Sequence, residues 1–248
     1  MSETVTAAMI VIGDEILSGR TKDRNIGHLA DMMTAVGIDL LEVRIVADDE
    51  PAIVAAVNEL RVRQTYVFTT GGIGPTHDDI TADAVARAFG VRCDYDERAY
   101  AMMEAFYAKR NMEFTAARKR MARMPEGAQH IDNPVSLAPG FRIENVFVMA
   151  GVPAIFQAML DNVVPTLRTG TKLLSETVHC PHGEGAIGDR LAAIQQAHPE
   201  TIIGSYPKYQ DGSFWTELVV RARDPRKLAA AKAAVEAMVG DIGALKGP

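Results

Sequence analysis

The sequence has few cysteines, no excess of positive charge and no repeats. Only two of its 248 residues are cysteines, Cys93 and Cys180, and they lie far apart. Two distant cysteines form no disulfide framework, so a reducing, cytoplasmic location is expected. The formal net charge of -6 argues against nucleic acid as a partner, because phosphate backbones bind basic surfaces.

Long hydrophobic runs are also missing. The apolar run over residues 146–160 is interrupted by Gly151, Pro153 and Gln157, and it is too short to span a bilayer. The N-terminal stretch MSETVTAAMIVIG has no basic segment and no signal-peptide cleavage site, so its apolar part is expected to be a buried strand. We therefore expect neither a membrane partner nor a secreted protein.

Strand-like and helix-like segments alternate through about residue 168. This alternation predicts βαβ units, that is, an α/β fold with a mostly parallel sheet and helices on both faces. Strands are expected at residues 7–12, 38–46, 65–70 and 146–149. Helices are expected at residues 26–36, from 51, at 81–90, 96–109 and 115–123, and from 153.

The pattern changes near residue 170. Strands are expected at residues 173–179, 201–206 and 214–222, with helices at 185–197 and 225–239. This βαββα order predicts a small α+β domain over residues 171–248, following an α/β domain over residues 1–170.

The stretch TTGGIGPTHDD, residues 69–79, follows a predicted strand directly. Ligands of open parallel sheets bind at the carboxyl ends of the strands, and glycines there let backbone N–H groups approach a phosphate. Carboxylates beside a phosphate imply a cation such as Mg²⁺ between them. The alternative is a glycine turn whose aspartates cap a helix, with Thr81 as a further cap. The expected ligand contacts in this loop are Thr70, Gly71, Gly72, Gly74 and Thr76, and the expected metal ligands include Asp78 and Asp79.

Two other strand ends carry acidic residues. The segment GDEILSGRTKDRN, residues 13–25, follows the first strand, and Asp48 and Asp49 follow the second. Three such loops at one sheet edge predict an acidic, glycine-lined crevice, although Asp23 and Asp49 are individually also typical helix caps. From the first segment we expect Asp14 as a metal ligand and Ser18, Asp23 and Asn25 as ligand contacts.

These motifs, in this order, resemble the molybdopterin-binding (MoaB/Mog) domain, and most closely the amino-terminal part of the CinA (competence/damage-inducible) family. The resemblance covers residues 7 to about 168 and includes APGF at 138–141. It departs from the family at residues 149–153, MAGVP in place of L-P-G-V-P, so that Ala150 stands where a proline is usual, and at residues 182–186, HGEGA in place of G-x-G-E-S. The second domain is similar to the CinA middle domain. Because the chain ends at Pro248, the amidohydrolase activity of full-length CinA is not expected here.

The resemblance implies a three-layer α/β/α fold and one of two chemistries. CinA members are associated with metal-dependent cleavage of ADP-ribose, and the Mog branch binds molybdopterin and adenylylates it. By position, Asp79 and Asp49 match the family's important carboxylates and are the expected catalytic residues. Gly71, Gly72 and Gly74 match its phosphate or pterin loop, and Asp14, Ser18 and Asp23 match its first-strand motif.

Weaker signals leave alternatives open. His179, Cys180 and His182 are spaced for zinc but lack a second ligand pair. His77 either contacts phosphate or is simply exposed. The basic residues at 109–110, 118–120 and 123 form either a solvated helix face or a guide for an anionic nucleotide.

We therefore expect a divalent-metal-dependent (Mg, Mn or Co) hydrolase of a nucleotide pyrophosphate such as ADP-ribose. The alternatives are molybdopterin binding or adenylylation, and a non-catalytic nucleotide-binding regulatory module. The expected partner is a small nucleotide or pterin ligand, and a homo-oligomer is a further expectation.

Overall fold

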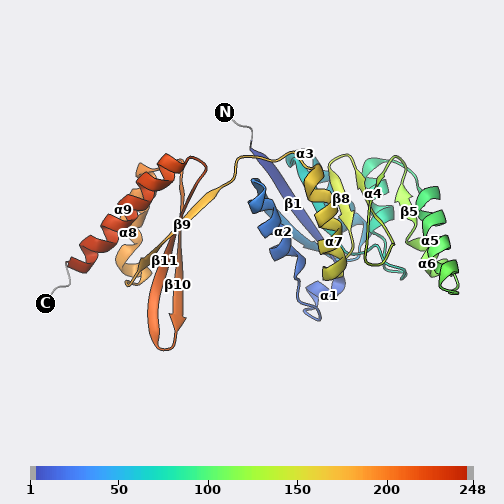
Figure 1. Ribbon diagram of the computed structural model, residues 1–248, viewed down its shortest axis with the longest axis horizontal. Coiled ribbons are helices and arrows are strands. Elements are labelled where there is room, and N and C mark those ends of the chain that lie inside the picture. The colour runs from blue at the N-terminus through green and yellow to red at the C-terminus, as the bar shows by residue number, and fades with distance from the viewer. Residues whose placement is uncertain (1–3, 245–248) are drawn as a thin grey trace. The chain divides into compact units, whose positions relative to one another are not determined.

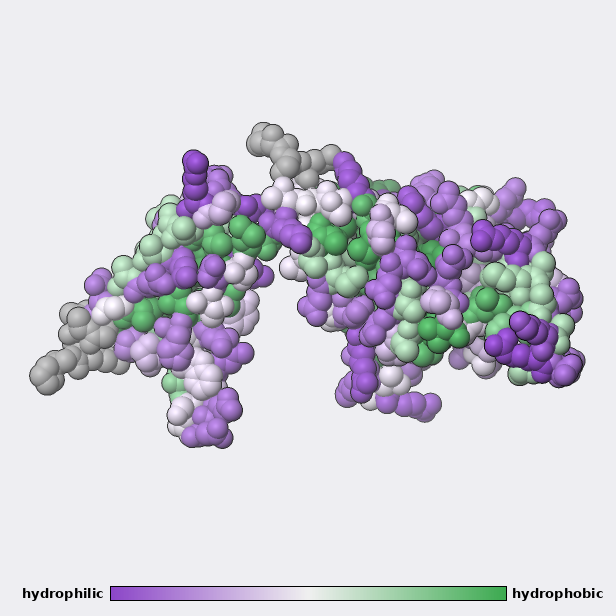
Figure 2. Space-filling view, in the orientation of Figure 1, coloured by the Kyte–Doolittle hydropathy of each residue, from purple (hydrophilic) through white to green (hydrophobic). Residues whose placement is uncertain are grey.

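The computed structural model describes residues 4–244, and the chain divides after Gly170 into two compact units (Figure 1). Within residues 4–244, none of the helices has the length and apolar character needed to cross a membrane. Hydrophilic and hydrophobic residues alternate in patches over the face shown in Figure 2.

The first unit is built around a six-stranded sheet. Its order is β2-β1-β3-β8-β7-β6, with the first four strands parallel and the last two antiparallel to their neighbours. The sheet is thus mostly parallel, as the alternation of segments predicted. Its strands are β1 (Val5–Ile12), β2 (Ile38–Val46), β3 (Tyr66–Thr70), β6 (Gln129–Ile131), β7 (Gly140–Ile143) and β8 (Val146–Met149).

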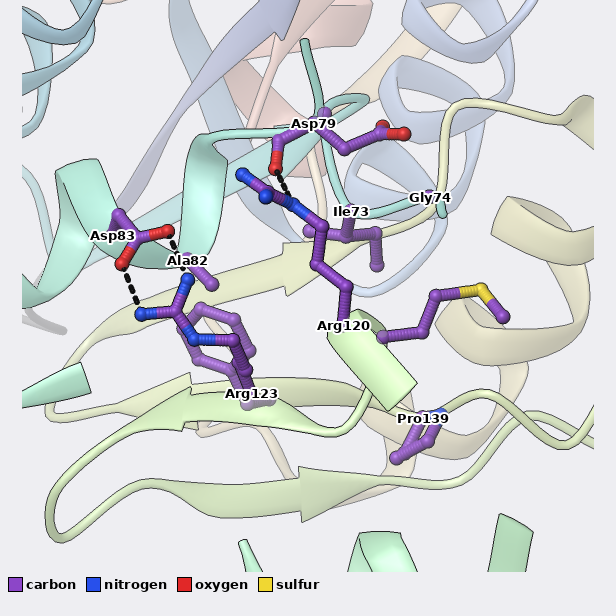
Figure 3. Close-up of a pocket in the computed structure, with 11 residues that line it drawn as sticks. Ile73, Gly74, Asp79, Ala82, Asp83, Arg120, Arg123 and Pro139 are labelled. Atoms are coloured by element: carbon purple, nitrogen blue, oxygen red, sulfur yellow. Dashed lines mark hydrogen bonds and ion pairs between the residues drawn. The ribbon is translucent and has the colours of Figure 1, made fainter. Parts of the chain in front are cut away.

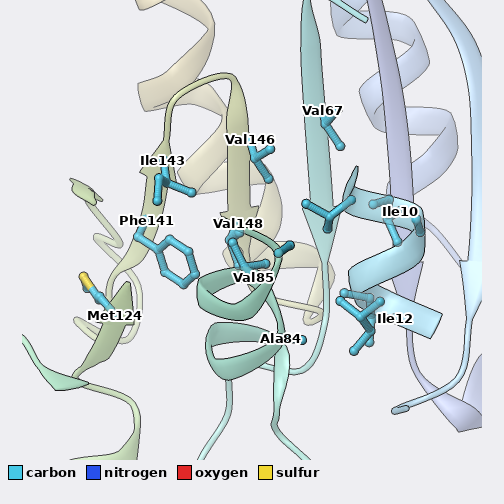
Figure 4. Packing of buried hydrophobic residues seen from close by; sticks show 14 of the residues in the cluster. Ile10, Ile12, Val67, Ala84, Val85, Met124, Phe141, Ile143, Val146 and Val148 are labelled. Carbon is cyan, nitrogen blue, oxygen red and sulfur yellow. The ribbon is translucent and has the colours of Figure 1, made fainter. Parts of the chain in front are cut away.

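Helices cover both faces of this sheet, which confirms the three-layer fold. Alternate residues of β1 point to opposite sides: Ile10 joins a core with α3 and α4, and Met9 joins a core with α2 and α7 (Figure 4). A strand buried on both faces reads as a continuous apolar run. The helices of this unit are α1 (Asp14–Leu17), α2 (Asn25–Ala35), α3 (Glu50–Arg63), α4 (Thr81–Phe89), α5 (Glu97–Lys109), α6 (Ala116–Arg120), α7 (Pro153–Val163) and the 3₁₀ helix η1 (Val164–Thr166).

One expected helix is shorter than the sequence indicated. The helix predicted over residues 115–123 ends at Arg120, and Arg123 instead begins β5 (Arg123–Pro125). This strand pairs with β4 (Cys93–Tyr95), placing Arg123 opposite Tyr95. Arg123 also makes two hydrogen bonds of 2.7 Å to Asp83. Tertiary pairing therefore overrides the local preference for helix. Strands β4, β6 and β7 were not predicted either.

The second unit has the predicted βαββα order. Its strands form an antiparallel sheet in the order β10-β11-β9. Val178, Leu218 and Val220 from the sheet and Ile187 and Val235 from the helices share one core. The elements are β9 (Leu174–Cys180), α8 (Glu184–Ala197), β10 (Ile202–Gln210), β11 (Ser213–Ala222) and α9 (Pro225–Ala244).

Candidate functional site

The carboxyl ends of β1, β3 and β8 are joined by close backbone contacts. Gly71 has φ +103°, and a Cβ added there would overlap the carbonyl oxygen of Ile12. A Cβ added at Gly151 would lie 3.3 Å from the Cα of Gly71. A side chain at Gly71 would therefore clash whether or not a ligand is bound, so this glycine has a structural role.

Asn25 links two of these strand ends. Its Nδ2 donates to Thr70 Oγ1 and to the carbonyl oxygen of Gly151, both at 2.9 Å, and Thr70 Oγ1 donates to Ala150 O at 2.9 Å. The side chain is almost fully buried, and its Oδ1 has no hydrogen-bond partner among the described residues. Two expected ligand contacts, Asn25 and Thr70, are thus brought together at the sheet edge and connect its loops.

The carboxylate of Asp79 closes the glycine loop. Its Oδ2 accepts hydrogen bonds from the Thr76 N–H at 2.8 Å and from Thr76 Oγ1 at 2.5 Å. A Cβ added at Gly74 would lie 2.6 Å from the same oxygen. Gly74, Thr76 and Asp79, which were expected to share the site, therefore lie together, and the carboxylate of Asp79 stabilises the turn. Its catalytic role stays a prediction.

Thr81 was expected to cap the helix after the loop, and this expectation is wrong. Thr81 is the first residue of α4, whose N-cap is Ile80. The hydroxyl of Thr81 donates instead to the carbonyl oxygen of Gly71 at 3.1 Å. A Cβ added at Gly72, which has φ +66°, would overlap that hydroxyl. This hydrogen bond therefore holds Gly71, the first glycine of the loop, against the start of α4.

Two adjacent aspartates after β2 have different environments. Asp49 caps α3, because its Oδ2 accepts from the Ala52 N–H at 3.0 Å. Asp48 points the other way, and its Oδ2 accepts from the Asp14 N–H at 2.9 Å. Burial raises the pKa of Asp48, and the negative charges of Asp14, Glu15 and Asp78 raise it further. The catalytic role expected of Asp49 stays a prediction, and Asp48, to which the sequence assigned no role of its own, is the residue bonded to Asp14.

Two other residues expected to contact a ligand, Asp23 and Ser18, take no part in the hydrogen bonds found at the glycine loop within the described residues. Asp23 Oδ1 accepts from the Ile26 N–H at 2.8 Å, which is the capping role left open by the sequence. Ser18 ends α1, where its N–H donates to Asp14 O at 2.8 Å, and its side chain is exposed. Their contacts with a ligand stay predictions.

A complete metal site is not formed by side chains alone. Within residues 4–244, no three Asp, Glu, His or Cys side chains are grouped closely enough to hold a metal ion. The expected ligands Asp14, Asp78 and Asp79 do not form such a group, and neither do His179, Cys180 and His182. Any cation at the glycine loop would need additional ligands from water or from a substrate.

Two basic residues also lie beside the glycine loop. Arg120 Nε donates to the carbonyl oxygen of Asp79 at 3.3 Å, and Arg123 forms a two-pronged ion pair with Asp83 (Figure 3). Both arginines line a small hollow of about 20 Å³ together with Gly72 and Gly74. Other members of the basic patch contact aromatic rings instead, namely Arg110 over Phe106, Arg118 over Tyr107, and Lys119 near Tyr100 and Phe114.

Residues 8–169, which carry this entire arrangement, match the family model described as "Probable molybdopterin binding domain". The chain belongs to the molybdopterin-binding domain family. Outside this domain, residues 172–245 match a model described as "FAD synthase, middle domain". The sequence had indicated a resemblance of this part to the CinA middle domain.

Relatives of this molybdopterin-binding domain protein include CinA-like chains. A protein of Caldivirga maquilingensis is 38% identical over 166 residues, covering 65% of either chain. A CinA-like protein of Desulfosudis oleivorans is 36% identical over 206 residues, covering 78% of this chain but 49% of the relative. This chain therefore spans less than two thirds of either relative's length.

One solved structure is similar in both sequence and fold. The crystal structure of the protein CinA with unknown function from Thermoplasma acidophilum is 31% identical, with a TM-score of 0.61. The match covers 66% of this chain and 98% of that one. These findings confirm the resemblance to the CinA branch.

Proposed function

We propose that this molybdopterin-binding domain protein hydrolyses the pyrophosphate bond of a dinucleotide such as ADP-ribose with the help of a divalent cation. The observation that carries the proposal is the pairing of opposite charges around the glycine loop. The charges of Asp14 and Asp78 act on Asp48, and Arg120 lies beside Asp79 at the same loop. A phosphoanhydride beside a hard cation needs both kinds of group.

The carboxylates fit a cation that is shared with the substrate. Mg²⁺ commonly binds through one or two carboxylates and completes its shell with water and substrate phosphates, so a cluster of three protein ligands is not required. Asp14, Asp48 and Asp78 offer the hard oxygen atoms that such an ion prefers. Burial raises the pKa of Asp48 and the neighbouring negative charges raise it further, and a cation would relieve that repulsion. When bound, the ion would polarise phosphoryl oxygens.

The protein's own groups bind and orient the substrate. Gly72 and Gly74 line the hollow, and the positive end of α4, which follows the loop directly, favours a phosphate there. Arg120 is positioned by the carbonyl oxygen of Asp79 and offers further N–H donors to a phosphate oxygen. Asp79 holds the loop closed through Thr76, so these donors stay in place before the reaction.

A second candidate function is the binding or adenylylation of molybdopterin. The description of the matching family model favours it. A pterin phosphate would place its phosphate at the same loop, so the two functions compete for one site.

One incubation series separates these functions. Purified protein is mixed with ADP-ribose, NAD, FAD or ATP, with and without Mg²⁺, Mn²⁺ or Co²⁺, and release of AMP is followed by chromatography. Metal-dependent release of AMP from a dinucleotide is the expected result. Tight pterin binding without release would favour the second candidate, and nucleotide binding without any turnover would indicate a regulatory module.

A matched pair of variants ties the reaction to the loop. Arg120→Gln is expected to slow turnover, while Arg110→Gln, at the residue that ends α5 and lies over the ring of Phe106, is expected to have no effect. Equal activity of both variants and the wild type would show that Arg120, beside the glycine loop, takes no part in the reaction.

A further inference from the structure

A second and wider cleft adjoins the hollow at the glycine loop. It has a volume of about 510 Å³, which lies within the usual range for small-molecule sites. Arg120 and Arg123 line both spaces, so a ligand at the glycine loop would extend into this cleft. Its other walls are Pro75, Thr76, His77, Tyr95, Ala116 and Ala117.

The two arginines shared by the spaces differ in what they can still bind. Both terminal nitrogens of Arg123 are hydrogen-bonded to the carboxylate of Asp83. Arg120 takes part in none of the ion pairs found within residues 4–244; its Nε donates to the Asp79 carbonyl oxygen at 3.3 Å, and its positive charge also acts on the nearby Asp78. Its guanidinium therefore has unused donors, which is the arrangement that recognises a phosphate oxygen.

An aromatic ring forms another wall of the cleft. Tyr95 is 48% exposed and lies directly opposite Arg123 in the β4–β5 pair. Its ring makes an edge-to-face contact with Tyr100, with centroids 5.7 Å apart and planes at 76°. A ring that is fixed on one side and exposed on the other is a stacking surface for a flat heterocycle. The small side chains Ala116 and Ala117 leave room for such a group.

We propose that this cleft is a subsite for a planar heterocycle that carries a phosphate. The heterocycle stacks on Tyr95, and the phosphate binds Arg120 where the cleft meets the glycine loop. The proposal rests on the proposed function, because it places the nucleoside end of a dinucleotide next to the scissile pyrophosphate. A purine nucleotide and a pterin phosphate share this chemistry, and the experiment distinguishes them.

The test is calorimetric binding without metal and without turnover. The ligands are AMP, adenosine, which lacks the phosphate, and ribose 5-phosphate, which lacks the base. Tyr95→Ala is expected to weaken the binding of AMP and of adenosine by about fivefold to a hundredfold, which is the range for losing a base–aromatic stack. The affinity for ribose 5-phosphate is expected to stay unchanged. Arg120→Gln is expected to weaken the binding of AMP and of ribose 5-phosphate by about tenfold and to leave the affinity for adenosine unchanged.

Controls separate stacking from damage to the fold. Tyr95→Phe is expected to bind AMP like the wild type, and Tyr209→Ala, at an exposed tyrosine of the second unit, is expected to change nothing. Thermal unfolding of each variant verifies that it is folded. A pterin monophosphate is titrated in parallel; tighter binding than AMP with the same dependence on Tyr95 and Arg120 would identify the pterin as the source of the heterocycle.

The outcomes also separate this subsite from the proposed reaction. If Tyr95→Ala bound both AMP and the pterin monophosphate as the wild type does, or if the wild type bound neither, the subsite would be overturned. A protein that shows the expected binding pattern yet hydrolyses no dinucleotide keeps the subsite and overturns the hydrolase.

Discussion

The glycine loop has an acidic side and a basic side, and the two are stabilised differently. The charges of Asp14 and Asp78 act on Asp48, and none of the three has a lysine or arginine as an ion-pair partner within the described residues. Arg123 is neutralised by Asp83, whereas Arg120 donates to the Asp79 carbonyl oxygen; the Thr76 side chain and the charge of Arg120 both lower the pKa of Asp78. Asp14 and Asp48 thus keep negative charge without a basic ion-pair partner in the described residues, and Arg120 keeps unused donors. This division suits a ligand pair of opposite charge, a cation and a phosphate.

The largest expected effect comes from removing the cation that the acidic side is proposed to hold. Treatment with EDTA is expected to abolish hydrolysis of ADP-ribose, and added Mg²⁺ or Mn²⁺ is expected to restore it. AMP binding on the basic side, followed by calorimetry, is expected to survive chelation. Full turnover after exhaustive chelation would show that the acidic side works without metal.

A slightly smaller effect is expected at Asp79, which lies between the two sides. Asn in place of Asp79 can still accept from Thr76, so the loop should keep its shape, but the negative charge is lost. We expect turnover to fall by about two orders of magnitude or more if that charge takes part in the reaction. Steady-state kinetics and thermal unfolding measure the two quantities. Near-normal turnover would falsify the catalytic role and leave Asp79 as a purely structural residue.

The neighbouring aspartates offer a matched pair on the acidic side. Asp48→Asn is expected to slow turnover by about tenfold to a hundredfold, because it removes a carboxylate that faces Asp14. Asp49→Asn is expected to leave turnover nearly unchanged, since asparagine caps a helix about as well as aspartate. The comparison uses the same substitution one residue apart. The reverse ranking would return the catalytic assignment to Asp49.

The smallest expected effect is on stability and depends on pH. The pKa of Asp48 is raised in the folded protein, so protonation of Asp48 favours the folded state, and that stabilisation is lost as the pH rises through the raised pKa. At pH 7, the free energy of unfolding of Asp48→Asn, measured by urea denaturation, should therefore exceed that of the wild type by up to about 1 kcal/mol. Below pH 3.8, the ordinary value for aspartate, the difference should vanish. A variant less stable than the wild type at pH 7 would mean that the acidic side is not under repulsion.

The fold was largely predictable because its main signals are local. Strands β1 and β3 are buried on both faces, so their sequences are continuous apolar runs. The helices that follow the strands carry recognisable end signals, such as Pro51 in the first turn of α3 and Gly90 after α4. The strands that escaped prediction have three or four residues. Arg123 pairs with Tyr95, 28 residues earlier, and no local sequence pattern predicts a pairing between such distant residues.

The grouping of several candidate residues was predictable, whereas their individual contacts were not. Parallel strand ends meet at one edge, so the loops carrying Asn25, Thr70 and Asp79 could be placed together from sequence. Asp48 and Asp49 are chemically identical in sequence, and only the hydrogen bond to Ala52 shows which one caps the helix. Arg120 was likewise one of several basic residues until the aromatic partners of its neighbours were known.

Steric exclusion at Gly71 and Gly72 bears on how this loop would respond to random mutagenesis. A side chain at either position meets Ile12 O or Thr81 Oγ1, so a library selected only for folding should already recover glycine at both. Gly74 differs, because an added Cβ meets the end of the Asp79 side chain, which can rotate away. Comparing survivors of a folding selection with survivors of an activity selection would therefore separate the loop's architecture from its chemistry at residue 74.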